Sequence, residues 1–257
     1  RDRAQAYRDR IAEALKARAV ARQDLTDAEA RLMPADRVVR LPDGIDERTA
    51  AAALLKGLTA WYLLRRTYRV KAGETILFHA AAGGVGLIAC QWARHLGATV
   101  IGTVGSEAKA ELARAHGCDH AIVYSSEDFV ARVREITDGA GVPVVYDSVG
   151  ADTWEGSLDC LSRFGTMVSF GNACGPVPPL APTVLSAKGS LFLTRPTIFD
   201  YIAERDDLVA GSDELFEVLA TGAVEIEVNQ TYPLAEAAQA HRDLESRANT
   251  GSTVLLP

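Results

Sequence analysis

A run of small residues between an apolar segment and a helical one is the feature of this sequence best suited to bind a ligand. The apolar segment Thr75–His79 leads directly into residues 80–86, AAAGGVG. Small side chains let a pyrophosphate approach the backbone, and the free N–H groups and dipole of a helix N-terminus favour its charge. Ala81, Gly83 and Gly86 take the three glycine positions of the G-x-G-x-x-G fingerprint, with alanine at the first. Because strand, turn and helix signals agree, we predict a dinucleotide-binding turn rather than one selected only for tight packing.

The next apolar segment, 99–103, indicates which dinucleotide the turn would hold. An NAD site needs an Asp or Glu near the end of this strand to hold the ribose 2′-hydroxyl, whereas here Val104, Gly105 and Ser106 follow. No carboxylate stands there to repel a 2′-phosphate, and Lys109 offers a cation within the next helical turn. These residues favour NADPH over NADH, although Lys109 is equally compatible with an ordinary surface lysine.

The elements that must position this turn alternate regularly along the chain. Apolar segments alternate with helical ones, which is typical of parallel βαβ units with right-handed crossovers. The nearly all-apolar segment 142–147 suits a sheet that is covered on both faces. We therefore predict an α/β fold with a doubly wound parallel sheet of Rossmann type. The expected strands are 36–42, 75–79, 99–103, 120–123, 142–147, 166–170 and 190–194, and the expected helices are 49–68, 84–96, 107–116, 129–137 and 153–161.

The two ends of the chain have different patterns from the middle. Residues 1–33 are rich in Ala, Arg, Asp and Glu, and Tyr7, Ile11 and Leu15 recur at a helical spacing. We expect a helical N-terminal segment with helices near 2–22 and 27–33, either packed on the domain or binding a partner. Beyond Pro196 the expected elements are a mainly helical stretch over 199–221, a strand at 224–228, a helix at 234–246 and a strand at 253–256.

Composition excludes several classes of partner. The net charge of −7 over 257 residues disfavours a nucleic acid or an anionic membrane, because both require a basic surface. The four cysteines form no Cys-x-x-Cys pair, which indicates reduced thiols in a cytoplasmic protein rather than zinc ligands or disulfides. No apolar run has the length of a membrane span, and the N-terminus has no signal-peptide pattern. The chain begins at Arg1 rather than Met, so we expect an upstream segment to have been removed or omitted.

Several short motifs in combination resemble one family. They are LKGLTA at 55–60, AAAGGVGL at 80–87, GTVG at 102–105, VYDSVG at 145–150 and SFGN at 169–172. Together they are similar to the zinc-free NADPH:quinone oxidoreductases, the zeta-crystallin-like branch of the medium-chain dehydrogenase/reductase superfamily. The resemblance runs from about residue 34 to residue 257.

The resemblance implies roles for individual residues toward NADPH. Lys109, Tyr124 and Arg247 match positions that surround the adenosine 2′-phosphate, beside the backbone of Gly105. Positions that match the turn and the nicotinamide end complete the expected cofactor site: Ala81, Gly83, Gly84, Val85, Thr59, Phe170 and Asn172. For Asp147 and His79 we expect structural roles, the first as a strand-end carboxylate that bonds to loop N–H groups.

The resemblance also implies a domain organisation. The family carries an N-terminal GroES-like catalytic domain, and only its last stretch is matched here. We expect a helical segment at 1–33, a Rossmann NADPH-binding domain at 71–223, and remnants of the catalytic domain at 34–70 and 224–257. The family often forms homodimers by pairing the edge strand that 190–194 matches, so we expect a homodimer.

Three functional interpretations remain open at this stage. The first is a zinc-independent oxidoreductase that transfers hydride from NADPH to a quinone or an activated double bond such as an enone, with the proton coming from water. The second is a catalytically impaired module that binds NADPH but lacks most of the substrate domain. The third is an assembly subunit.

Overall fold

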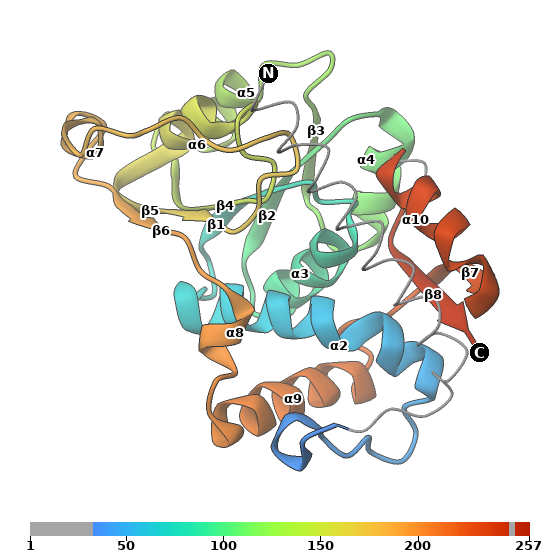
Figure 1. Ribbon diagram of the computed structural model, residues 1–257. Helices are drawn as coiled ribbons and strands as arrows, with labels where there is room; N and C mark the ends of the chain where they lie inside the picture. The colour runs from blue at the N-terminus through green and yellow to red at the C-terminus, as the bar shows by residue number, and fades with distance from the viewer. Residues whose placement is uncertain (1–32, 247–249) are drawn as a thin grey trace, which may run out of the picture.

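The structure is a computed structural model that describes residues 33–246 and 250–257. Its central element is a six-stranded parallel sheet (Figure 1). The strand order β3-β2-β1-β4-β5-β6 is that of the doubly wound Rossmann fold, so the predicted fold class is confirmed. Its strands are β1 (Thr75–His79), β2 (Thr99–Val104), β3 (His120–Val123), β4 (Val142–Asp147), β5 (Leu161–Ser169) and β6 (Phe192–Thr194).

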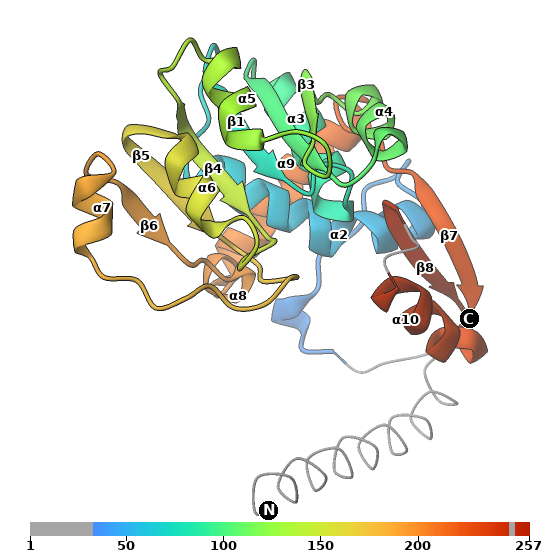
Figure 2. The same cartoon turned by 90° about the horizontal axis from the view of Figure 1, so that it is seen from above.

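Helices cover both faces of this sheet, as the two views show (Figures 1 and 2). One face carries α2 (Glu47–Trp61), the π-helix η3 (Tyr62–Thr67), α3 (Gly84–His95), α4 (Glu107–Ala115) and α9 (Arg205–Ala220). The other face carries α5 (Phe129–Ile136), α6 (Trp154–Cys160) and α7 (Thr183–Ala187), and α8 (Ile198–Tyr201) lies near the end of β6. This arrangement leaves the carboxyl ends of the strands as the edge where ligands bind in such sheets.

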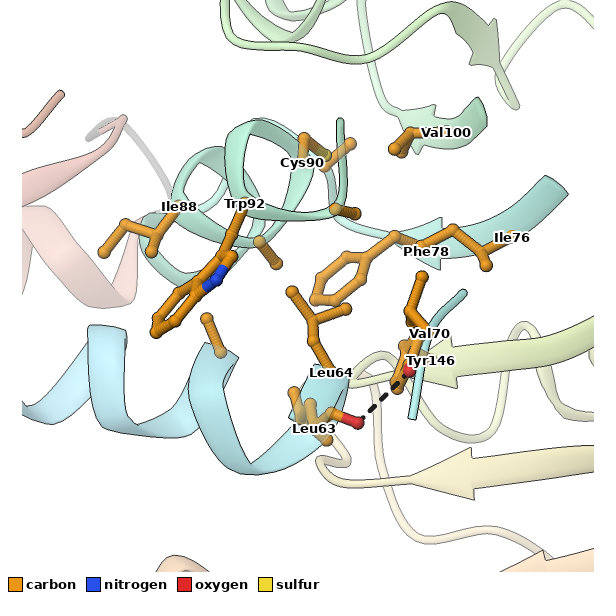
Figure 3. Packing of buried hydrophobic residues seen from close by; sticks show 14 of the residues in the cluster. Leu63, Leu64, Val70, Ile76, Phe78, Ile88, Cys90, Trp92, Val100 and Tyr146 are labelled. Atoms are coloured by element: carbon orange, nitrogen blue, oxygen red, sulfur yellow. Dashed lines mark hydrogen bonds between the residues drawn. The ribbon is translucent and has the colours of Figure 1, made fainter. Parts of the chain in front are cut away.

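The larger core lies between the sheet and α2, η3 and α3 (Figure 3). Phe78 of β1 and Trp92 of α3 are each 2% exposed, and Leu63 and Leu64 are fully buried. Tyr146 of β4 is also fully buried, and its hydroxyl donates a hydrogen bond to the carbonyl of Leu63 at 3.1 Å. This bond satisfies a polar group that would otherwise be costly inside the core, and it ties the sheet to the π-helix.

The region before α2 differs from the expectation. We predicted a strand at 36–42, but the short 3-10 helix η2 (Ala35–Arg37) occupies its start and no strand follows. The carbonyls of Asp36 and Val38 both accept hydrogen bonds from the guanidinium of Arg205. A side chain of α9 therefore takes the bonds that a neighbouring strand would have taken, and the strand prediction is wrong.

A second, two-stranded sheet follows α9 and lies beside α2 and α3 in both views (Figures 1 and 2). It consists of β7 (Val228–Pro233) and β8 (Ser252–Leu256), joined through the 3-10 helix η4 (Leu234–Glu236) and α10 (Ala237–Glu245). The strand predicted at 224–228 is wrong in position, because the side-chain amide of Gln91 bonds both the N–H and the carbonyl of Glu225. The helices predicted at 2–22 and 27–33 lie outside the described residues, apart from Met33.

Candidate cofactor site

The small-residue turn joins the end of β1 to the start of α3 as predicted. Ala80 adopts a left-handed conformation with φ of 55°. The N–H of Gly83 donates a hydrogen bond to the carbonyl of Ala80 at 2.9 Å. The N–H of Ala81 donates to the carbonyl of Thr103 on β2 at 3.1 Å. Gly83 is the N-cap of α3, and no described side chain caps this helix. The first N–H groups of α3 are thus left for an anionic ligand, which the helix dipole also favours.

Gly86 explains why the backbone can turn so tightly. A Cβ at this position would lie 2.4 Å from the carbonyl oxygen of Ala80 and 2.6 Å from that of Ala81. Those neighbours are backbone atoms of the turn itself, so they cannot move aside without distorting it. This is the close helix–strand approach for which the third glycine of the fingerprint is required.

A chain of buried hydrogen bonds supports the turn from below. His79, the last residue of β1, is 0% exposed, and its Nδ1 lies 2.8 Å from the hydroxyl of Thr103. Its Nε2 lies 2.9 Å from Ser157 Oγ, which in turn donates to Asp147 Oδ2 at 2.8 Å. This polarity assigns the proton of a neutral imidazole to Nε2, with the Thr103 hydroxyl donating to Nδ1. Burial lowers the pKa of His79, against the opposing charge of Asp147, so the neutral ring is favoured.

Asp147 completes this chain at the end of β4. Its Oδ1 accepts the N–H groups of Val149 at 2.8 Å and Gly150 at 3.1 Å, and its Oδ2 also accepts the Thr153 hydroxyl at 2.7 Å. The structural roles expected for Asp147 and His79 are therefore confirmed. Together they fix three strand ends at the ligand-binding edge of the sheet.

The expected adenosine end of the site lies after β2. A Cβ on Gly105 would lie 2.8 Å from the hydroxyl oxygen of Tyr124, so these two predicted residues lie against each other. Lys109 lies in the first turn of α4, and it forms no ion pair with any carboxylate in the described part of the chain. The nearby carboxylate of Glu107 is paired with Arg114 at 2.9 Å, which reduces its repulsion of an anion. Arg247, the fourth residue expected here, lies outside the described residues.

A pocket of about 370 Å³ lies at the expected nicotinamide end. It brings together three of the predicted residues: Thr59 of α2, Val85 of α3 and Phe170, which follows β5. Asn172, which follows β5, is not among the lining residues of this pocket. It lies instead beside Gly150, which belongs to the loop after β4. The pocket has the size of a small-molecule site, which is typically about 300–1,000 Å³.

Sequence reasoning missed the rest of the pocket wall. The remaining lining residues are Tyr62, Arg195, Pro196, Thr197 and Ile198. The segment 195–198 is remote in sequence from the turn and carries no glycine pattern. The one signal that could have identified this part of the wall is Arg195, an arginine just past the last predicted strand of the parallel sheet, at its carboxyl edge.

A larger hollow of about 670 Å³ lies elsewhere, between α2, α8 and residues 37–39. Its walls are aliphatic and aromatic apart from Arg37, with Leu55 and Phe199 among them. A polar dinucleotide needs hydrogen-bond donors and a positive potential, so this hollow does not fit the cofactor despite its size.

No group of three or more His, Cys, Asp or Glu side chains in the described part of the chain is placed to hold a metal ion. None of the helices described is long and apolar enough to cross a membrane.

The doubly wound sheet and its glycine turn define a dehydrogenase-type dinucleotide-binding domain, and a family model described as "Zinc-binding dehydrogenase" matches residues 84–214. The chain is 57% identical over 230 residues to a quinone oxidoreductase of Pseudomonas aeruginosa, covering 90% of this chain and 71% of the relative. The chain belongs to the quinone oxidoreductase family of the medium-chain dehydrogenase/reductase superfamily. The predicted resemblance is thereby confirmed.

Solved structures agree with this assignment. The crystal structure of Escherichia coli quinone oxidoreductase complexed with NADPH has a TM-score of 0.84 and 54% identity, covering 87% of this chain and 69% of that one. A 2-haloacrylate reductase structure has a TM-score of 0.83 and 49% identity, covering 88% of this chain and 71% of that one. A curated 2-haloacrylate reductase from a Burkholderia species is 48% identical over 233 residues, covering 90% of this chain and 70% of the relative.

Proposed function

We propose that the protein is an NADPH-dependent oxidoreductase that reduces quinones or activated double bonds. One observation carries the proposal: a glycine turn with an uncapped helix N-terminus and a 370 Å³ pocket lie along the same edge of one parallel sheet. Close relatives named quinone oxidoreductase and 2-haloacrylate reductase support the two acceptor classes.

The residues present fit NADPH. The turn leaves the N–H groups of Gly84 and Val85 uncapped, and Gly105 lies against Tyr124 next to the helix that carries Lys109. We assign the pyrophosphate to the turn, the 2′-phosphate to Lys109 and its neighbours, and the nicotinamide to the pocket. The full set proposed to hold the cofactor is Ala81, Gly83, Gly84, Val85, Gly105, Lys109, Tyr124, Arg247, Thr59, Phe170 and Asn172.

When bound, NADPH supplies a hydride to the acceptor, and the protein supplies orientation and exclusion of water. Phe170, Val85 and Ile198 form an apolar wall of the pocket, which favours stacking of a flat acceptor on a flat ring. Misplacement of the reacting atoms by ~1 Å can cost ~100-fold in rate, so this wall acts mainly by positioning. The proton that completes the reduction comes from water.

The domain division stays a proposal, with 71–223 as the Rossmann domain, 34–70 and 224–257 as remnants of the catalytic domain, and 1–33 as a helical segment. Zinc independence is likewise proposed, supported by the Cys spacing in the sequence. The cysteine usage supports a cytoplasmic location, and the net charge of −7 supports the absence of nucleic-acid and membrane partners.

We also propose a homodimer that pairs β6 with its symmetry mate. Phe192 and Leu193 of this edge strand are 61% and 39% exposed, which is a liability for a strand that stays unpaired. Sedimentation should show a dimer, and Leu193→Lys should shift it toward the monomer. A wild-type protein that stays monomeric at high concentration would refute this assembly.

Two measurements test the proposed activity. Steady-state oxidation of NADPH with a simple quinone should exceed the rate without protein, and calorimetry should show NADPH binding. Binding without turnover would favour the alternative, a catalytically impaired NADPH-binding module. If the folded protein does not bind NADPH, both the proposed enzyme activity and the alternative of an NADPH-binding module are contradicted.

A further inference from the structure

Arg195 is a cation at the nicotinamide end of the site that the proposed cofactor contacts do not use. It follows β6 directly, and one of its guanidinium nitrogens, Nη1, donates to the carbonyl of Ser169 at 2.7 Å. It forms no ion pair with any carboxylate of residues 33–246 or 250–257, and it lines the 370 Å³ pocket. A guanidinium carries five N–H donors, so most of its hydrogen-bonding capacity remains after the Ser169 bond.

Tyr62 places a second donor on the same pocket. Its ring stacks on Tyr201 with centroids 4.6 Å apart, and its hydroxyl makes no hydrogen bond within the described part of the chain. Burial raises the pKa of Tyr62 to about 12, Tyr201 adds to this rise, and the positive charge of Arg195 opposes it. The Tyr62 hydroxyl therefore keeps its proton at neutral pH and can donate a hydrogen bond.

The strand that leads to Arg195 is remote from the strand that leads to the turn. The turn follows β1, and β4 and β5 separate β1 from β6 in the sheet. Three strand spacings of about 4.8 Å place the backbone at the end of β6 roughly 14 Å from the end of β1. Arg195 nevertheless lines the pocket together with Val85, so its guanidinium can act on what occupies the pocket.

We infer that Arg195, with Tyr62 on the wall of the same pocket, forms a subsite for the acceptor oxygen that becomes negative during reduction. The inference rests on the proposed function and names the chemistry of its substrate. Hydride adds to the conjugated system of a quinone or enone, and the displaced π electrons move onto a carbonyl oxygen. The product is an enolate, and a proton from water then neutralises it. For a quinone, this product is a tautomer of the hydroquinone, and transfer of one proton from the ring carbon to oxygen restores the aromatic ring.

A subsite of this kind favours acceptors with a carbonyl oxygen conjugated to the reacting bond. Donors that face a developing oxyanion stabilise the transition state more than the neutral ground state. Val85, Phe170 and Ile198 give the pocket an apolar wall, and the low dielectric of such a wall strengthens this attraction. An isolated alkene offers no such oxygen and would be a poor substrate.

The test uses 4-nitrophenol as a stable oxyanion and 4-nitroanisole as its neutral counterpart, each titrated into protein saturated with NADP⁺. The wild type should bind the phenolate at least tenfold more tightly than the anisole, and the absorbance of the bound phenol should report a lowered pKa. Arg195→Gln should abolish both effects, whereas Arg195→Lys should restore part of them. Arg163→Gln removes an exposed arginine of β5 outside the pocket and should change neither.

The affinity for NADP⁺ is measured first, because it separates the two proposals. Protein that fails to bind NADP⁺ contradicts the proposed function itself. Protein that binds NADP⁺ but does not prefer phenolate to anisole contradicts the oxyanion subsite alone, as does unchanged phenolate binding in Arg195→Gln. Should that variant fail to fold, the wild-type preference and a several-fold weaker phenolate affinity in Tyr62→Phe still decide the matter.

Discussion

The turn after β1 and the pocket near the end of β6 are the two ends of the proposed cofactor site, and they are built in opposite ways. The turn is a single stretch of chain that presents backbone atoms, and at Gly86 it leaves no space even for a methyl group. The pocket is assembled from side chains of α2, α3, the end of β5 and the segment 195–198. The proposed phosphate site therefore depends on the exclusion of side chains from the turn, which lets a ligand reach the backbone. The proposed acceptor site depends on the identity of side chains, which substitution can alter.

The polar groups at the two ends differ in the same way. Under the turn, His79, Ser157 and Asp147 are buried and their hydrogen bonds are satisfied by one another. Arg195 and Tyr62, which both line the pocket, keep donors that no group in the described part of the chain uses. A satisfied buried network stabilises the fold, while spare donors are available to a ligand. Substitutions should consequently cost stability at the first end and affinity at the second.

The largest effect is expected at Gly86. Gly86→Ala should destabilise the fold by about 3 kcal/mol and abolish NADPH binding, because its Cβ would overlap two backbone oxygens. Chemical denaturation and calorimetry measure the two effects. Gly222→Ala is the control: nothing lies within 4 Å of its Cβ, so only the positive φ of 70° opposes it, at about 1 kcal/mol. Equal losses in the two variants would show that the turn is not sterically restricted.

Removing the proposed 2′-phosphate contacts should change cofactor choice without changing stability. Lys109→Ala combined with Arg247→Ala should weaken NADPH binding by about 2 kcal/mol, or roughly thirtyfold, since charge-assisted hydrogen bonds are lost. The affinity for NADH should stay within about twofold on the same reasoning. Lys71→Ala, a substitution in the loop before β1, serves as the control. A similar loss for both nucleotides would place the 2′-phosphate elsewhere.

The buried network should make stability depend on pH. Since the pKa of His79 is lowered below its ordinary 6.5 by burial, the unfolded chain takes up a proton before the folded one does. Its contribution is fully present above pH 6.5 and is lost as the pH falls, at about 1.4 kcal/mol per pH unit. His79→Gln should flatten the pH dependence of the unfolding free energy below pH 6.5 relative to the exposed control His95→Gln. Parallel curves for the two variants would contradict this.

The smallest effect is expected at Thr59 in the pocket. Its hydroxyl donates to the Leu55 carbonyl of its own helix at 2.7 Å, so Thr59→Val removes only a local bond. Stability should change by less than about 0.5 kcal/mol, and NADPH affinity by no more than a few-fold. Denaturation and calorimetry again measure both. A loss as large as that in Gly86→Ala would mean that the pocket is as restricted as the turn.

Local patterns predicted the Rossmann sheet well. The bounds of β1, β3 and β4 are those expected from their apolar residues. Parallel strands that are covered on both faces are nearly continuous apolar runs, so their ends can be recognised in the sequence. The N-terminal start of β5 at Leu161 was missed, since Arg163 and Phe164 are exposed and Phe164 has a φ of 62°. The strand expected at 224–228 was misplaced because Gln91, more than 130 residues away in sequence, bonds its backbone.

The sequence by itself determined the phosphate turn, the absence of a carboxylate after β2 and the family, since each depends on residues adjacent in the chain. Only the tertiary structure decided which side chains meet at the far end of the site. Arg195, Tyr62 and Phe170 come from three separate segments, and no periodicity in sequence encodes the order in which parallel strands assemble. The chemistry proposed for the acceptor oxygen therefore rests on the packing of the sheet rather than on any motif.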